Sequence, residues 1–258
     1  MAKDAANDPA DFWWLVPDEA KKFRFVYTKH QHPYSDQQNT DRDPPSVERD
    51  YSFYSVDSSG NLSKNEKRYP VEFLNKWKKR CGNTNVFRSL ALFAADENAD
   101  KLLGPLVLDI DREDYMEGEG MVQDLGKALQ DTRKLVRCLQ QSYRVKESDL
   151  CVLFTGHKGF NVEVRLGAVG IGSVNPQWDQ FKFKRKEINQ ALGGSDDHPF
   201  VDRLHSFVRL HNSVNKWVAC DGQEVARMKI QLTLDELFSL EATAIRNLSE
   251  DLVQASIL

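Results

Sequence analysis

The stretch Leu106–Asp114, which reads LVLDIDRED, decides the fold that we expect for this chain. Four apolar residues surround its first aspartate, and a glycine and a proline precede the run, which predicts a strand buried on both faces. Side chains at positions i and i+2 of a strand point to the same face. Asp109 and Asp111 are therefore expected to project together, with Cα atoms about 6.6 Å apart.

Two carboxylates on one face of a strand predict a divalent metal site. At this separation they repel each other by about 2.5 kcal/mol if the effective dielectric constant is near 20. A cation bound between them turns the repulsion into attraction, and hard cations such as Mg²⁺ and Mn²⁺ prefer carboxylate oxygens. The alternative for the same D-x-D pattern is a strand end that reaches solvent, where acidic residues are common.

The composition of the chain limits the kinds of protein to which it can belong. The chain has 258 residues, 40% of them hydrophobic and 29% charged, as in ordinary globular proteins. The net charge of −4 gives no signal for nucleic acid, but a local basic groove is compatible with it. We find no apolar run that could span a bilayer, no secretory signal and no C-x-x-C pair. We therefore expect a cytoplasmic or nucleoid-associated protein with reduced cysteines and no membrane partner.

Strand-like and helix-like patterns alternate along the chain and predict the α+β class, with a central sheet that carries the acidic pair. The expected strands span residues 23–28, 86–93, 106–114, 150–155, 160–166, 207–210 and 225–232. The expected helices span residues 71–80, 123–143 and 176–189, and a last one starts at the capping box formed by Thr233 and Glu236. Residues 31–50 read as a long loop and residues 51–61 as a hairpin.

A second special stretch, FTGHKGFNV, lies at residues 154–162 between two expected strands. Gly156 and Gly159 allow a tight turn and a close approach of the backbone to a ligand. Thr155, His157 and Lys158 place a hydroxyl, an imidazole and an ammonium around it. Backbone N–H groups in such turns form anion-binding concavities, which predicts a phosphate cradle; a plain hairpin turn with solvated side chains is the alternative.

The third stretch, DHPFVDRLHSFVRLHNSVNK, runs from residue 197 to residue 216. It opens beside two aspartates, Asp196 and Asp197, where the following proline favours an extended chain, so that a carboxylate here would complete a metal site. Its second half carries four donors suited to phosphate oxygens: Arg209, Ser213, Asn215 and Lys216. The alternative is a polar loop that leads into an edge strand.

In this order the three stretches resemble the motifs of the archaeo-eukaryotic primase, or primase-polymerase, superfamily. LVLDID resembles its D-x-D strand, and residues 155–161 resemble its S-G-x-x-G-x-H turn. RLHNSVNK resembles its R-L-x-x-S-x-[HN] stretch, which follows an aspartate at a spacing of twelve that selects Asp197. The resemblance covers residues 87–216. It departs from the family pattern at Thr155, which replaces serine, and at Asn161, an amide that replaces histidine and cannot transfer a proton.

The resemblance implies a fold and a domain organisation. The fold would be an RRM-like mixed sheet core with an adjoining α/β subdomain. The whole chain, residues 1–258, would be a single catalytic domain. Its parts would be an N-terminal subdomain (1–85), the catalytic sheet core (86–232) and a C-terminal helix (233–258).

The resemblance also implies an activity, template-directed nucleotidyl transfer that makes or extends primers from nucleoside triphosphates. Asp109, Asp111 and Asp197 would be the catalytic, metal-binding residues for Mg²⁺ or Mn²⁺. The nucleotide-binding residues would be Thr155, Gly156, His157, Lys158, Gly159, Asn161, Arg209, Ser213, Asn215 and Lys216. The partners would be a single-stranded DNA template with its primer, and a helicase or accessory replication domain.

Two alternatives follow from the same residues. One is a different two-metal enzyme, a nuclease or phosphodiesterase, which would hydrolyse rather than add nucleotides. The other is a non-catalytic replication-initiation or single-strand nucleic-acid-binding module with a degenerate site, which would tolerate loss of Asp109. For the template we expect a basic surface on Lys182, Lys184, Arg185 and Lys186, although a solvated helix face explains the same run.

Overall fold

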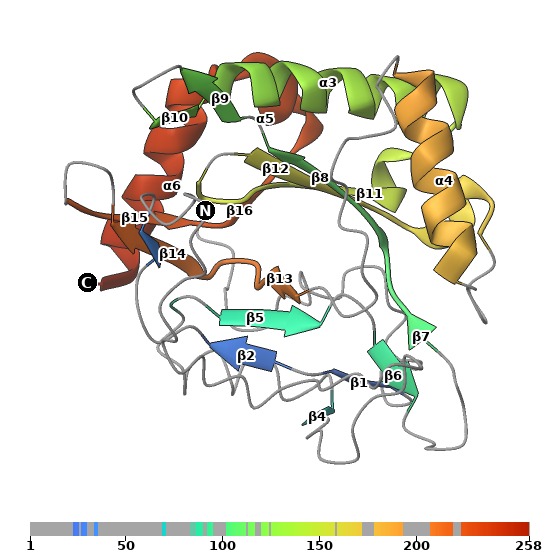
Figure 1. The fold of residues 1–258 in the computed structure, drawn as a ribbon, viewed down its shortest axis with the longest axis horizontal. Helices are drawn as coiled ribbons and strands as arrows, with labels where there is room; N and C mark the ends of the chain where they lie inside the picture. Colours follow the sequence, from blue (N-terminus) through green and yellow to red (C-terminus); the bar gives the residue numbers. More distant parts are fainter. Residues whose placement is uncertain are drawn as a thin grey trace.

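The computed structural model (Figure 1) describes residues 23–25, 27–29, 34–35, 69–70, 84, 86–89, 92–94, 102–111, 113–116, 120–123, 125–157, 159–171, 178–192, 207–218 and 223–257. The predicted helix at 71–80, the hairpin at 51–61 and the residues Lys158, Asp196 and Asp197 lie outside these ranges. The expected loop at 31–50 lies outside them except for Tyr34–Ser35, where the expectation of a loop is wrong because these residues form a short strand, β3. Within them, helices and antiparallel sheets combine as the α+β class requires, which confirms the class predicted from the sequence.

The described helices are α3 (Leu125–Ser142), α4 (Trp178–Ala191), α5 (Leu234–Ser239) and α6 (Ala242–Ile257), with short 3-10 helices at Glu147–Asp149 and Leu166–Val169. The central sheet has the strand order β16 (Ile230–Leu232), β11 (Leu150–Phe154), β12 (Gly159–Val164) and β8 (Leu106–Asp111). All three of its strand pairs are antiparallel, so the expected mixed sheet is wrong for this core. The parallel strand pair among the described residues joins β14 to β3 instead.

The other described strands form smaller sheets around this core. One sheet has the order β13 (Phe207–Arg209), β5 (Val86–Ser89) and β2 (Tyr27–Lys29). Another has β15 (Glu224–Met228), β14 (Val214–Val218) and β3 (Tyr34–Ser35). A third has β4 (Tyr69–Pro70), β1 (Phe23–Phe25), β6 (Leu92–Ala94) and β7 (Leu102–Leu103), and a hairpin joins β9 (Glu113–Met116) to β10 (Gly120–Gln123).

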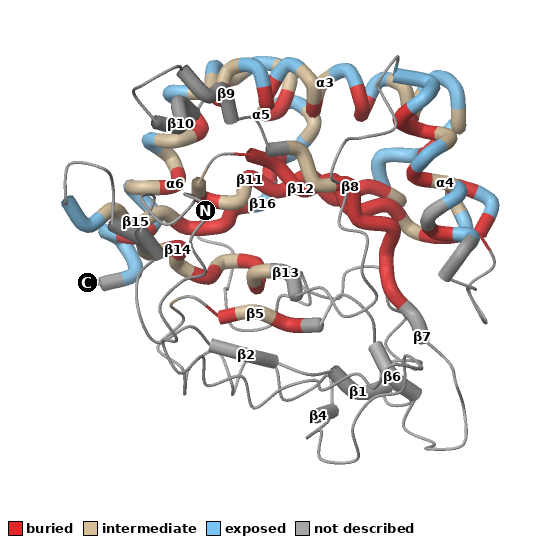
Figure 2. The backbone as a smooth tube through the Cα atoms, viewed as in Figure 1, coloured by how far each residue is buried: buried red, intermediate tan, exposed pale blue. Residues whose placement is uncertain are grey.

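The hydrophobic core lies between the central sheet and α3, which runs along one face of the sheet in Figure 1. Alternate residues of β8, β11 and β12 supply it, and the burial colours of Figure 2 show these strands as the most buried part of the fold. Phe154 and Phe160 form a cross-strand pair with ring centroids 5.5 Å apart. Leu129, Val136 and Leu139 of α3 pack on this face, because an amphipathic helix must bury its apolar stripe.

The opposite face of the central sheet carries polar side chains among buried apolar ones such as Val107 and Leu153, and the β13–β5–β2 sheet lies beyond it in Figure 1. Asn161 and Glu163 of β12 belong to this face, since they alternate with the core residues of the same strand. The guanidinium of Arg88 on β5 lies 3.6 Å from the carboxylate of Glu163, and both side chains are about 2% exposed. A buried polar layer therefore joins the two sheets.

Four expected strands are each divided into two, and the halves belong to different sheets in every case. Residues 23–28 contribute to β1 and β2, residues 86–93 to β5 and β6, residues 106–114 to β8 and β9, and residues 225–232 to β15 and β16. The break in the last of these falls at Lys229. Its N–H donates to the carbonyl of Ser213 at 2.9 Å, and its carbonyl accepts from the N–H of Asn212 at 2.9 Å. These bonds to a turn replace the ladder bonds that would have continued the strand.

Helix boundaries depart from the prediction by two residues where tertiary structure intervenes. The helix expected at 123–143 begins at Leu125, because Gln123 belongs to β10. It is followed by Arg144 in the left-handed conformation, with φ of 57°. The capping box predicted at Thr233 is present: its hydroxyl accepts from the N–H of Glu236 at 3.1 Å, and α5 follows directly. Among the described residues no helix is long and apolar enough to cross a membrane.

Candidate active site

Asp109 and Asn161 are partners in the centre of the antiparallel pair β8–β12. The Asn161 side chain donates a hydrogen bond from Nδ2 to Oδ1 of Asp109 at 2.5 Å. Asn161 is buried and Asp109 is half-buried, so the carboxylate lies at the edge of the polar layer. The strand register therefore brings the first and second sequence motifs together, although 52 residues separate the two side chains.

Lys229 connects this pair to the third motif. Its side chain is buried, and its Nζ donates to Oδ1 of Asn161 at 2.9 Å and to the carbonyl oxygen of Arg209 at 3.1 Å. Its backbone is bonded to the turn at Asn212 and Ser213. A single buried lysine thus touches residues of the second and third motifs, and reaches Asp109 of the first through an amide.

The turn at Thr155–Gly159 packs against the strand end that precedes Lys229. Gly156 has φ of +79°, and a Cβ added there would lie 3.1 Å from the Arg227 carbonyl oxygen and 3.2 Å from that of Met228. The Thr155 hydroxyl donates to the Gly159 carbonyl at 3.0 Å and closes the turn. Glycine is favoured at residue 156, because an L side chain there would be strained by the positive φ and would lie in tight contact with backbone atoms.

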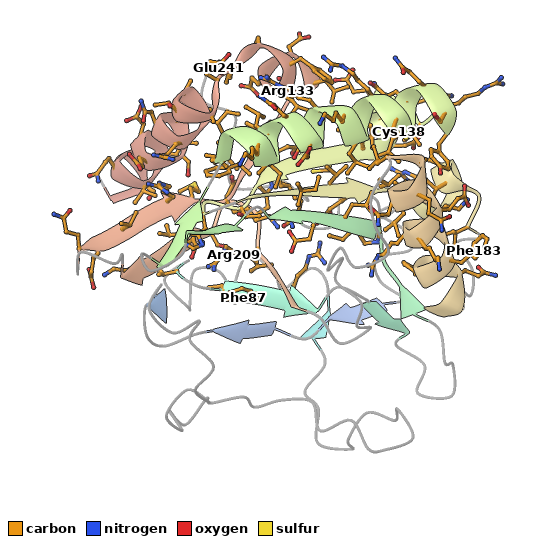
Figure 3. The ribbon with its side chains drawn as sticks, turned by 45° about the horizontal axis from the view of Figure 1, so that its top comes forward. Phe87, Arg133, Cys138, Phe183, Arg209 and Glu241 are labelled. Atoms are coloured by element: carbon orange, nitrogen blue, oxygen red, sulfur yellow. The ribbon has the colours of Figure 1, made fainter. Side chains whose placement is uncertain are left out.

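The third motif forms a tight turn followed by a hairpin. Ser213 is buried, and its hydroxyl donates to the Leu210 carbonyl at 2.6 Å. The guanidinium of Arg209 lies over the ring of Phe87, 4.5 Å from its centroid (Figure 3). Asn215 is buried, whereas the half-buried Lys216 forms an ion pair with Glu224 at 2.6 Å across the β14–β15 hairpin. These donors lie on β13 and on the chain segment that follows it.

The predicted metal ligands are described only in part. Asp109 is placed as above; the backbone of Asp111 pairs with Gly159, and its side chain is not described. Asp197 lies outside the described residues. Within those residues no group of three or more His, Cys, Asp or Glu side chains gathers as a metal site. The oxygens of Asp109 are of the kind that Mg²⁺ and Mn²⁺ prefer, so this residue fits the expected metals.

Sequence analysis missed three buried charged residues of this region: Arg88, Glu163 and Lys229. Glu163 carries a usable signal, because it alternates with apolar residues in the strand stretch FNVEV and shares a face with Asn161. Lys229 also interrupts an otherwise apolar run, MKI, with a charge. A charged residue between residues that pack in the core indicates a specific buried partner, since an uncompensated buried charge is very costly.

The basic run on α4 does not form one continuous surface. Arg185 is buried at 2% exposure, because it shares the inner face of the helix with Phe181 and Ile188 at i−4 and i+3. The Lys184 ammonium donates to Glu187 at 2.7 Å and lies 5.5 Å from the ring centroid of Tyr143. The expectation of four exposed basic residues is therefore wrong for Arg185. The outer face of α4 instead presents Phe183, which is 69% exposed (Figure 3).

Comparison with known proteins adds no relative to this picture. No family model matches the sequence, and no curated protein matches it.

Proposed function

We propose that the chain is a template-directed nucleotidyltransferase of the primase-polymerase type, which makes or extends primers from nucleoside triphosphates. The observation that carries the proposal is the chain of contacts from Lys229 to Asn161 and on to Asp109, together with the bond from Lys229 to Arg209. It joins residues of all three motifs in one polar layer. Convergence of the three motifs on one layer is what a shared active site requires.

In the proposed reaction Asp109, with Asp111 and Asp197, would hold Mg²⁺ or Mn²⁺. The metal would supply charge that activates the attacking 3′-oxygen and stabilises the leaving pyrophosphate. Asn161 holds the Asp109 carboxylate in one orientation through its 2.5 Å hydrogen bond. Backbone N–H groups of the turn at 155–159, including His157 and Lys158, would bind the triphosphate.

Two donors of the third motif, Arg209 and Lys216, would bind phosphate oxygens. Arg209 is held in place by Phe87 and presents a planar guanidinium suited to phosphate. Lys216 would have to leave or share Glu224, which is mostly exposed and therefore a weakly bound partner. Ser213 and Asn215 are buried and would shape the turn more than touch the substrate.

The single-stranded template would lie partly on α4. The exposed ring of Phe183 provides a surface on which bases can stack, and the exposed Lys186 supplies positive charge three residues further along the helix. A primer, and a helicase or accessory replication domain, complete the proposed partners.

A second candidate function has one observation in its favour. The Asp109 carboxylate already accepts a hydrogen bond from the amide of Asn161, and a non-catalytic site would need the same bond. In that case the chain would be a replication-initiation or single-strand nucleic-acid-binding module. It would bind DNA and leave nucleoside triphosphates unchanged.

A primer-synthesis assay tests the proposal. Single-stranded DNA, labelled ribo- or deoxyribonucleoside triphosphates and either Mg²⁺ or Mn²⁺ are incubated with the parent chain and with Asp109→Ala. We expect nucleotide addition by the parent and its loss in the variant. Asp131→Ala is the matched control, since Asp131 lies on α3 and pairs with Lys134. Binding without addition by the parent would favour the second candidate, and degradation of the DNA would indicate a nuclease.

A further inference from the structure

Lys229 occupies a position that strand packing does not explain. Its neighbours Met228 and Ile230 both belong to the hydrophobic core, yet the lysine side chain is only 1% exposed. Burying an ammonium group is costly unless acceptors replace its water. Here a side-chain amide oxygen at 2.9 Å and a backbone carbonyl oxygen at 3.1 Å do so.

We propose that Lys229 is a positioning residue of the active site. It holds the Asn161 amide with its NH₂ group towards Asp109, and thereby fixes the carboxylate in the orientation that binds the metal. The inference rests on the proposed function, because it concerns the same Asp109 site. It adds a residue outside all three motifs and gives it a defined role.

The physical reason lies in the shape of an amide. The two ends of the Asn161 side chain are nearly equal in size, so packing alone leaves two orientations available. In one, the oxygen accepts from Lys229 and the nitrogen donates to Asp109, as observed. In the other, NH₂ would face an ammonium and oxygen would face a carboxylate, and both contacts would be repulsive. The buried cation therefore selects the orientation in which Asn161 donates to the carboxylate.

The lysine can act in this way because its own position is anchored. Its backbone N–H and carbonyl are bonded to Ser213 and Asn212, each at 2.9 Å, and its ammonium also binds the Arg209 carbonyl. Side-chain substitutions at residue 229 leave the two backbone bonds in place. Some groups do not bind the metal but hydrogen-bond to a metal ligand and fix its orientation. Removing such a group typically changes metal affinity by about 10- to 100-fold.

A single variant cannot separate this role from simple charge. Loss of the Lys229 ammonium removes a cation near Asp109, which by itself strengthens Mn²⁺ binding, whereas loss of orientation weakens it. A double-mutant cycle cancels the charge effect, because that effect is present in both arms of the comparison. The cycle compares the change in Mn²⁺ affinity caused by Asn161→Ala in the parent with the change that it causes in the Lys229→Met variant.

The experiment measures Mn²⁺ affinity of the full chain from the electron paramagnetic resonance signal of the free ion. The proteins are the parent, Asn161→Ala, Lys229→Met and the double variant. We expect Asn161→Ala to weaken binding by about tenfold or more in the parent. In the Lys229→Met background the same change should have less than about a threefold effect, because an unoriented amide no longer holds the carboxylate. Equal effects in both backgrounds would overturn the inference.

Two controls separate this inference from the proposed function. Asp109→Ala shows whether the measured Mn²⁺ binds at Asp109, and Lys186→Met removes an exposed lysine of α4 without touching the polar layer. Absence of binding that depends on Asp109 would overturn the proposed function and this inference together. Binding that depends on Asp109 but shows no coupling would overturn this inference alone.

A measurement on the parent covers the case in which Lys229→Met does not fold. With the amide held between Lys229 and Asp109, one Nδ2 proton of Asn161 should resonate further downfield of the other than in a solvent-exposed asparagine and should exchange slowly with solvent. Nuclear magnetic resonance of the ¹⁵N-labelled chain reports both properties, and Asn161→Ala identifies the signal. Rapid exchange together with the ordinary separation of the two proton signals would show that the amide is not held, which contradicts the inference.

Discussion

Arg88 on β5 and Glu163 on β12 form a buried ion pair, with a guanidinium nitrogen 3.6 Å from a carboxylate oxygen. The two strands belong to different sheets, so the pair links the β13–β5–β2 sheet to the polar face of the central sheet. Both side chains are about 2% exposed, and loss of either partner would leave the other charge buried without its counter-ion. This relationship makes the pair the first target for a stability test.

Glu163→Gln should therefore destabilise the chain by about 3–5 kcal/mol, the usual cost of removing one partner of a buried pair. Replacing both residues with methionine should cost less than the sum of the two single changes, because no charge remains buried. Urea unfolding monitored by circular dichroism measures the free energies. Lys134→Ala, which breaks the exposed pair with Asp131, is the control and should cost less than about 1 kcal/mol. If Glu163→Gln also lowered the free energy of unfolding by less than about 1 kcal/mol, the buried pair would contribute little to stability.

Gly156 tests the turn at residues 155–159, and two glycines outside that turn, Gly167 and Gly170 at the Leu166–Val169 3-10 helix, serve as references. Gly156→Ala combines a φ of +79° with Cβ contacts of 3.1–3.3 Å to backbone atoms, and should cost about 2 kcal/mol or more. Gly170→Ala has a φ of +77° but open space, and should cost about 1 kcal/mol. Gly167→Ala meets neither restriction and should stay within about 0.5 kcal/mol of the parent. Thermal unfolding ranks the three variants by their loss of stability. If Gly156→Ala were as stable as the parent, the turn would not pack on β15.

Phe183→Ala should weaken binding of single-stranded DNA without affecting the fold. The ring is 69% exposed, so its removal leaves the core unchanged. Stacking of one base contributes about 1–3 kcal/mol, which corresponds to about 5- to 150-fold in affinity. Fluorescence anisotropy with a labelled oligonucleotide measures the change, and Leu192→Ala, at an exposed residue directly after α4, is the control. Unchanged affinity would place the DNA on another surface.

Tyr143, directly after α3, is hydrogen-bonded to Glu187 of α4, and its phenol should lose its proton only at high pH. Burial, followed by the hydrogen bond to Glu187 and the charge of that residue, raises the pKa of Tyr143 from 10.0 to about 12. The folded chain thus keeps a proton that the unfolded chain loses, so this group's contribution to stability is complete below pH 10 and is lost as the pH rises towards 12. The difference in tyrosinate absorbance between the parent and Tyr143→Phe measures the pKa.

Glu187→Gln separates the causes of the Tyr143 shift. It removes the negative charge beside the phenol and should lower the pKa of Tyr143, but not to its ordinary value, because burial is the largest cause. The same variant leaves Lys184 without the carboxylate to which it donates at 2.7 Å. A pKa that returns fully to that of an exposed tyrosine would assign the whole shift to Glu187.

Local patterns in the sequence were sufficient for several elements. The apolar run around Asp109 predicted β8, because a strand buried on both faces needs such a run. Alternation predicted β12, and the Thr233 capping box predicted the start of α5. The antiparallel turn at Gly156 followed from the glycines between two strands. Each of these features depends on residues that are close in the chain.

The sequence by itself thus determined the strand that carries Asp109, the amphipathic α3 and the α+β class, since periodicity and capping are local properties. Tertiary structure alone decided the break at Lys229 and the broken strand at 86–93. Bonds from Lys229 to a turn about sixteen residues earlier compete with the sheet ladder, and no local pattern records that competition. The pairing of Lys229 with Asn161, 68 residues away, is likewise a product of strand register, because only the folded sheets bring a buried cation and its acceptor together.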